Sequence, residues 1–214
     1  MKYLGLLITI LLLFSCSTAQ LVDTWKNPDT TIFESSKVLI VGMTPNMEAR
    51  SQFEKQLKVE YQARGIQAFM SIDIFEPDFT LDKKSEVEIK RVESILIAND
   101  FDAILVTKIA GVEDKLNFLK TYGNIENTRK RFRDDYYMNQ EIYFNHDYYE
   151  KYKIYHAESS LYCLCPSKDR ELIWKGYIDI TDPRSIDKTI NDYTYLLMDV
   201  LEEQQLINPK SNIE

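Results

Sequence analysis

The sequence predicts a single α/β (α+β) domain behind an N-terminal leader, with elements in the order β-α-β-α-β-β-β-α around a mixed sheet of two or three layers. Three observations predict it: unbroken apolar runs typical of buried strands, helical stripes between them, and one alternating strand near the C-terminus. Hydrophobic residues make up 44% and charged residues 28% of the 214 residues, as is ordinary for one globular domain.

The first strand–helix unit opens the domain. Val38 to Met43 is an unbroken apolar run, which favours a strand buried on both faces. Thr44 or Asn46 is the expected cap of the following helix, and Gly65 is expected to end it. The buried stripe of this helix consists of Met47, Phe53, Leu57 and Tyr61. Residues 66–75 are then expected to form the second strand.

The unit then repeats. Ser85 and Glu88 predict a capping box at the start of a second helix, and Asn99-Asp100 is expected to close it. Its buried stripe consists of Ile89, Val92 and Leu96. Ala103 to Val106 is again a buried-strand run, continuing towards Val112. Two such units in succession predict right-handed crossovers and a parallel core to the sheet.

The C-terminal part is predicted to be an antiparallel pair and a helix. A strand is expected over residues 151–165, followed by a turn. Leu172 to Ile180 alternates apolar residues with Lys175, Tyr177 and Asp179, which predicts a second antiparallel strand with one polar face. Asp182-Pro183 is the expected cap of the last helix. The stripe of that helix is Ile186, Ile190, Tyr193, Leu197, Val200 and Leu201.

A tyrosine-rich insertion, residues 113–152, precedes the fourth strand. Eight of the fourteen tyrosines lie between Tyr122 and Tyr155, which is unusual for an idle connection of this length. We expect an ordered hairpin whose outward rings and basic rim meet a partner. The candidate partner-binding residues are Arg129, Arg131, Arg133, Tyr136, Tyr137 and Tyr143. The alternative is a solvated basic turn beside tyrosines that pack on the domain.

The leader carries the most specific motif, Leu13-Phe14-Ser15-Cys16. Lys2 precedes an apolar run from Leu4 to Phe14, which is too short to span a membrane and has the length of a signal-peptide core. The motif resembles the lipobox of bacterial lipoproteins, which implies cleavage after Ser15 and acylation of Cys16 by a diacylglyceryl group and a third chain. An ordinary cleaved signal peptide is the alternative.

The expected organisation follows from that cleavage. Residues 1–15 are the signal peptide, 16–36 a lipidated tether, 37–208 the domain and 209–214 a tail. The tether has the composition of a loop, although Trp25 favours docking on the domain as a short edge strand. Ser17 rather than Asp follows the cysteine, which in such lipoproteins implies the outer membrane. With no acidic cluster after Cys16, the periplasmic face is expected.

This layout resembles a broad group of Gram-negative envelope lipoproteins, including the α/β domains of the curli-secretion lipoprotein CsgG, the penicillin-binding-protein activator LpoB and the N-terminal domain of TolB. The resemblance rests on the strands Val38–Met43, Ala103–Val106 and Leu172–Trp174. It implies a non-enzymatic accessory or scaffolding role for an envelope protein partner. The alternative is a binder of small molecules or glycans, or a weak hydrolase, that uses the same tyrosines.

The sequence offers little for catalysis. It has no Gly-rich phosphate loop, Gly-x-Ser-x-Gly or His-Glu-x-x-His, so we expect no cofactor and no metal. His146 and His156 are the two histidines. Cys163 and Cys165 are expected to be packed thiols rather than a bridge or metal ligands. The net charge of −8, which becomes −9 when Lys2 is removed, disfavours nucleic acid as a partner.

Overall fold

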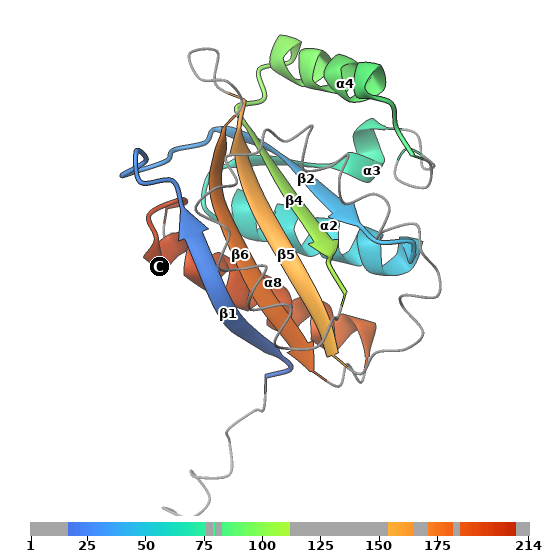
Figure 1. Ribbon diagram of the computed structural model, residues 1–214, viewed down its shortest axis with the longest axis vertical. Coiled ribbons are helices and arrows are strands. Elements are labelled where there is room, and N and C mark those ends of the chain that lie inside the picture. Colours follow the sequence, from blue (N-terminus) through green and yellow to red (C-terminus); the bar gives the residue numbers. More distant parts are fainter. Residues whose placement is uncertain are drawn as a thin grey trace, which may run out of the picture.

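The computed structural model describes residues 17–75, 79, 83–111, 154–164, 171–181 and 185–208, which form a mixed sheet between two helical layers (Figure 1). The six strands lie in the order β1-β6-β5-β4-β2-β3. They are β1 (Ala19–Lys26), β2 (Lys37–Met43), β3 (Gln67–Met70), β4 (Ala103–Ile109), β5 (Ile154–Cys163) and β6 (Leu172–Thr181). The described helices are α2 (Met47–Gln62), α3 (Ser71–Ile74), α4 (Glu86–Ala98) and α8 (Ile186–Glu203). The predicted fold class is confirmed, in its three-layer form.

The sheet has a parallel half and an antiparallel half. Strands β3, β2 and β4 are parallel, whereas β5, β6 and β1 follow as antiparallel neighbours. Because β3 and β4 lie on opposite sides of β2, crossovers of the same hand place α2 and α4 on opposite faces. The predicted parallel core is confirmed.

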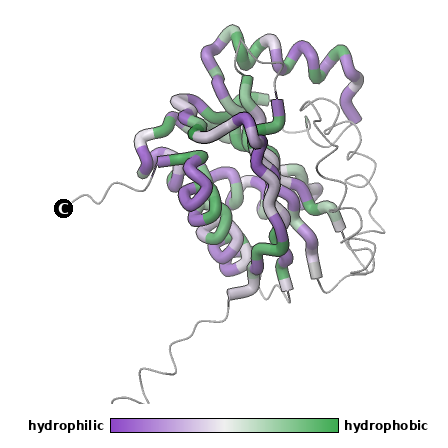
Figure 2. Tube along the Cα trace, turned by 60° about the vertical axis from the view of Figure 1, so that its left-hand side comes forward, coloured by the Kyte–Doolittle hydropathy of each residue, from purple (hydrophilic) through white to green (hydrophobic). Residues whose placement is uncertain are grey.

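Two hydrophobic cores lie on the two faces of the sheet. On the first, which we call the α2/α8 face, Val38 and Leu105 pack with Leu57 of α2 and Leu197 of α8. On the second, the α4 face, the core contains Leu39, Val41, Met43, Ile89, Val92, Leu96, Ile104 and Val106. Figure 2 shows hydrophilic and hydrophobic residues alternating along the helices, as expected of helices with one buried stripe.

Several strand ends and helix starts lie at one end of the sheet, which we call the basal edge. Strands β2, β4 and β6 finish there, at Met43, Ile109 and Thr181, and β1 begins there at Ala19. Helices α2 and α8 also begin at this end, so their N-terminal turns lie over it (Figure 1).

The predicted helix boundaries are largely confirmed. Asn46 caps α2 by accepting from the Ala49 amide, and Gly65 has φ +78 beyond its end. The capping box of Ser85 and Glu88 is present at the start of α4. The expected cap of the last helix is wrong: Ser185 caps α8 by accepting from the Lys188 amide, and Asp182-Pro183 lies outside the described residues.

One predicted strand differs from the structure. The second strand was expected over 66–75, but β3 ends at Met70 and the chain turns into α3, where Glu54 of α2 accepts from Ser71 and Ile72. The alternating strand predicted from Leu172 to Ile180 is confirmed as β6, and two of its polar positions are covered, since Lys175 and Tyr177 are both 7% accessible. No helix among the described residues has the length and apolar character to cross a bilayer.

The segment placed in the tether begins with an edge strand. Strand β1 pairs with β6 in antiparallel fashion, from Ala19 opposite Ile180 to Lys26 opposite Trp174. Trp25 is half-buried against the α4-face core, which confirms its docking on the domain. The predicted tether is therefore loop only in part, because its residues Ala19–Lys26 form a strand of the sheet.

Candidate functional site

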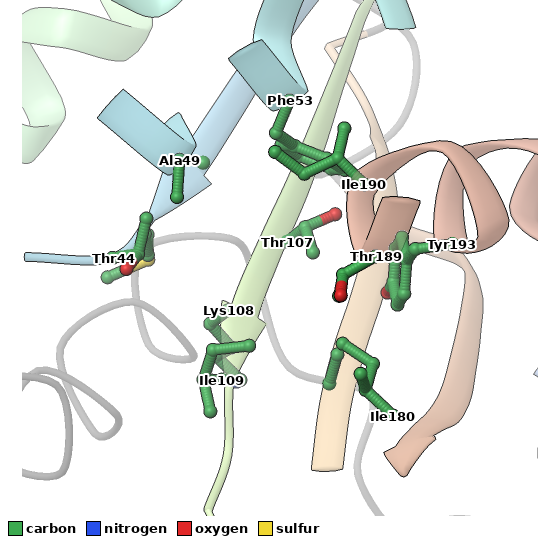
Figure 3. A pocket seen from close by; sticks show the side chains of 13 residues that line it. Thr44, Ala49, Phe53, Thr107, Lys108, Ile109, Ile180, Thr189, Ile190 and Tyr193 are labelled. Carbon is green, nitrogen blue, oxygen red and sulfur yellow. The ribbon is translucent and has the colours of Figure 1, made fainter. Parts of the chain in front are cut away.

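A pocket of about 140 Å³ opens at the basal edge between the sheet and the first turns of α2 and α8. Figure 3 shows Phe53 of α2 and Ile190 of α8 side by side above Thr107 of β4. The wall is almost wholly apolar. Its lining residues are Gly42, Met43, Thr44, Ala49, Phe53, Thr107, Lys108, Ile109, Ala157, Ile180, Thr189, Ile190 and Tyr193.

The position of this pocket follows from the topology of the sheet. After β2 the chain crosses to β3 on one side, and β4 lies on the other side, so the carboxyl ends of β2 and β4 form a switch point. Open α/β sheets bind ligands at such points, because the diverging loops leave a crevice there. Met43 and Thr44 line the pocket from β2, and Ile109 lines it from β4.

A chain of three buried hydroxyls forms the polar part of the pocket floor. Thr107 Oγ1 and Ser159 Oγ lie 2.5 Å apart, and Ser159 Oγ and the Tyr193 hydroxyl lie 2.8 Å apart. Burial raises the pKa of the Tyr193 phenol above its ordinary value, so the group stays neutral. These hydroxyls satisfy one another and tie α8 to β4 and β5, which is a structural role.

One further hydroxyl on the wall has no such partner. Thr189 Oγ1 is buried and, among the residues described, makes no hydrogen bond. Thr189 stands one helical turn before Tyr193 and faces the same pocket (Figure 3). Among the described residues, the pocket therefore offers an apolar wall with one buried polar atom, Thr189 Oγ1, that has no hydrogen-bond partner.

A buried carboxylate fixes the backbone beside the pocket. Glu54 Oε1 accepts from the Gly42 amide (2.9 Å), from Arg50 Nε (3.0 Å) and from Ser71 Oγ (2.6 Å), and Oε2 accepts from the Ile72 amide (3.0 Å). A Cβ at Gly42 would lie 3.2 Å from the Phe53 ring, so glycine keeps this corner open. The network joins β2, α2 and α3 into one rigid corner of the pocket.

The opposite face of the sheet carries charge instead of hydroxyls. Glu158 of β5 accepts from Lys108 Nζ of β4 (3.1 Å) and Lys175 Nζ of β6 (2.7 Å), and also from Ser160 Oγ (3.2 Å). Lys108 thus lines the pocket from β4 while its ammonium pairs on the α4 face. All of these side chains are largely buried, so the cluster joins three strands rather than presenting charge to solvent.

His156 belongs to this charged face and not to the pocket. Its Nδ1 is hydrogen-bonded to Asp179 Oδ1 across the β5–β6 pair. Ser160, on the same face, is four strand residues away, roughly 13 Å at the rise of a strand. Ser159 points to the other face. His156 therefore activates neither serine, and this pair gives the hydrolase alternative no nucleophile from β5.

Cys163 corrects one expectation. It is disulfide-bonded, so the expectation of a packed free thiol is wrong. It stands at the end of β5 remote from the basal edge, opposite Ala103, whereas Ser17 stands at the basal edge. Cys165 is the third cysteine of the sequence and lies outside the described residues.

Cys16, His146 and the candidate partner-binding set all lie outside the described residues. That set consists of Arg129, Arg131, Arg133, Tyr136, Tyr137 and Tyr143. The pocket itself was missed by sequence reasoning. Its one signal is the pair of hydroxyl residues, Thr107 and Ser159, at inward positions of otherwise apolar strand faces.

The chain matches no family model and no curated protein in sequence. Among solved structures it is similar in fold to the PelC dodecamer from Paraburkholderia phytofirmans, with 10% identity and a TM-score of 0.42, over 87% of this chain and 97% of that one. It is also similar to lipoprotein GNA1162 from Neisseria meningitidis, with 11% identity and a TM-score of 0.39, over 78% of this chain and 96% of that one. Values this low establish no family.

Proposed function

We propose that this protein is a lipid-anchored, non-enzymatic lipoprotein of the outer membrane that holds its domain directly against the periplasmic face of the bilayer, as an accessory or scaffolding module for an envelope protein. The observation that carries the proposal is the spacing between the lipobox and the sheet. Only Ser17 and Thr18 separate Cys16 from β1, and two residues span at most about 7 Å.

The residues in that short gap are themselves tied to the domain. Asp192 of α8 accepts from the Thr18 amide (2.7 Å) and hydroxyl (2.8 Å), and the Thr18 carbonyl accepts from the Thr181 amide (2.8 Å). Ser17 Oγ lies within hydrogen-bonding distance of Ala19 O and N. The two residues between an acylated Cys16 and β1 are therefore too short and too firmly bound to let the domain move away from the membrane, so the basal edge faces the bilayer.

Two further observations support an envelope location. A disulfide at Cys163 suits an oxidising compartment such as the periplasm. Two or three acyl chains anchor a protein firmly without a spanning helix, because each buried CH₂ contributes about 0.8 kcal/mol. We assign the anchor to the outer membrane because Ser17, and not Asp, follows the cysteine. We assign it to the periplasmic face because no acidic cluster follows Cys16 in the sequence.

The partner contact in this proposal is the tyrosine-rich insertion. The described residues that flank it, Gly111 after β4 and Tyr155 in β5, are both near the basal edge. A partner bound there meets the domain beside the membrane. Replacing Tyr136, Tyr137 and Tyr143 by Ser tests this contact. We expect partner capture to weaken with little change in thermal stability, whereas a large loss of stability with unchanged capture would make these rings core.

The anchoring itself is tested with Cys16→Ser in the full chain. Acylated wild type should incorporate labelled palmitate and float with membranes, whereas the variant should carry no label and remain unprocessed or soluble. A processed variant that still floats without label would refute the anchor. Hydrogen exchange of the wild type on vesicles tests the orientation: slowing confined to the basal edge, at the starts of β1, α2 and α8, is expected, and uniform exchange would contradict it.

A further inference from the structure

We infer that the basal pocket takes the end of an acyl chain of a bilayer phospholipid. This assignment rests on the proposed function, because an anchor at Cys16 turns the basal edge towards the membrane. The N-terminal residues and the pocket share two elements. Thr18 is bound to β6 and α8, and Ile180 of β6 and Thr189 of α8 line the pocket.

The pocket lies close enough to the anchor to meet the bilayer. Strand β4, which forms its floor, is three strand spacings from β1, or roughly 14 Å. Its mouth is at the ends of β2 and β4 and the first turns of α2 and α8, at the same end of the sheet as the start of β1 (Figure 1). A bilayer that holds Cys16 is therefore adjacent to this mouth.

The size and chemistry of the pocket fit the end of an aliphatic chain. A dry cavity of about 150 Å³ lined by Leu, Ile and Phe accepts a benzene-sized molecule, and this pocket measures about 140 Å³. Phe53, Ile109 and Ile190, whose side chains belong to the α2/α8 face, supply its apolar wall. No charged atom faces it among the described residues, since Lys108 Nζ pairs with Glu158 on the other face.

The driving force differs from that of a ligand that enters from water. An acyl chain leaves one apolar medium for another, so the chain itself gains little. The gain comes from removing the wall of the pocket from water, which follows the usual proportionality to apolar area. Occupancy thus depends on the high local concentration of acyl chains at the membrane, and it requires the anchored state.

The test uses the full lipidated chain in vesicles of phosphatidylethanolamine and phosphatidylglycerol that include a phospholipid with a diazirine at the acyl terminus. After flotation and irradiation, peptides of β4 and α8 that hold Thr107–Ile109 and Ile190 should carry the adducts. Ala49→Phe fills the mouth and should lower them by about tenfold, because its ring takes over the shielding of the apolar wall from water that otherwise favours the acyl chain. Val59→Phe adds the same ring at a position of α2 that is 51% exposed, and should leave them unchanged.

A second variant keeps the inference falsifiable if Ala49→Phe unfolds. Thr189→Val keeps the shape of the wall but removes its unpartnered hydroxyl. Adduct yield should be maintained or rise for an aliphatic ligand, and a marked fall would show that the ligand needs a polar contact, which overturns the assignment.

The outcomes separate the two proposals. A chain that fails to float refutes the anchor. A chain that floats but carries no adduct in the pocket peptides, or carries the same adducts in Ala49→Phe, refutes the acyl site alone. In a parallel arm the protein's own chains are labelled metabolically with a diazirine fatty acid, and pocket adducts from this arm alone would overturn the phospholipid as the source.

Discussion

Glu54 and Glu158 are both buried carboxylates, but they hold different parts of the molecule together. Glu54 accepts hydrogen bonds from two backbone amides, one guanidinium and one hydroxyl, so it fixes the course of the chain at the corner of β2, α2 and α3. Glu158 is bound by side chains only, two ammonium groups and one hydroxyl. It therefore joins strands β4, β5 and β6, which are already paired through their backbones.

The difference teaches where a buried charge matters most. The donors of Glu54 at Gly42 and Ile72 are backbone amides, which cannot move away or lose a proton when the carboxylate is removed. The lysine donors of Glu158 stand on flexible four-carbon stems and have further interactions. We therefore expect the fold to depend more on Glu54 than on Glu158, although both are bound in networks of similar size.

The largest effect is expected from Glu54→Gln. The change removes the charge that pairs Arg50 and turns an amide donor towards existing donors, so the free energy of unfolding should fall by about 3–5 kcal/mol. Denaturant unfolding of the full chain measures it. Glu48→Gln, an exposed carboxylate on the same helix, is the control and should stay within about 0.5 kcal/mol. A loss at Glu54 no larger than at Glu158 would break the comparison.

Glu158→Gln should have a smaller effect, a loss of about 1.5–3 kcal/mol, the range for a hydrogen bond to a charged group. The lysines can readjust, whereas a backbone amide cannot. A double-mutant cycle with Lys175→Met isolates the pair across β5 and β6, whose atoms lie 2.7 Å apart. A coupling energy near zero would mean that Lys175 is held mainly by its other interactions.

The buried hydroxyl chain of Thr107, Ser159 and Tyr193 carries no charge, so its loss gives a reference for the effects at the two carboxylates. Tyr193→Phe removes one end of the hydroxyl chain but leaves Ser159 bonded to Thr107, so a loss of about 0.5–1.5 kcal/mol in unfolding free energy is expected. Tyr195→Phe, at a position 54% exposed on the same helix, should have no measurable effect. A loss at Tyr193 as large as that at Glu54 would show that charge is not the deciding factor.

The smallest effect is expected at Asp192, which is only partly buried. Burial raises the pKa of Asp192, but hydrogen bonds from Lys188 and Thr18 outweigh it, so the pKa lies below its ordinary value. Its contribution to stability is therefore full above about pH 4 and is lost as pH falls through the lowered pKa.

The variant Asp192→Asn should remove that acid-sensitive contribution, a few tenths to about 1 kcal/mol, and speed hydrogen exchange at the start of β1. Asp199→Asn, exposed on the same helix, is the control. An unchanged dependence of stability on pH between about 4 and 2 would show that Asp192 does not hold the N-terminal residues.

The sequence by itself determined the local features. Unbroken apolar runs predicted β2 and β4, and the N-cap residues Asn46 and Ser85 predicted the starts of α2 and α4. Both signals are local, because strand burial and helix capping depend on neighbours in the chain. The lipobox is likewise a local motif, and it predicts the anchor without any knowledge of the fold.

Only the tertiary structure decided the features that join distant residues. The pocket brings together Met43, Ile109 and Ile190, which are far apart in sequence, and no local pattern records that meeting. Alternation places Lys175 on the polar face of β6, but its burial in an ion pair with Glu158 of the neighbouring strand follows only from the pairing of β5 with β6. The same holds for β1: its composition is that of a loop, and its pairing with β6 and the bonds between Thr18 and Asp192 make it part of the sheet.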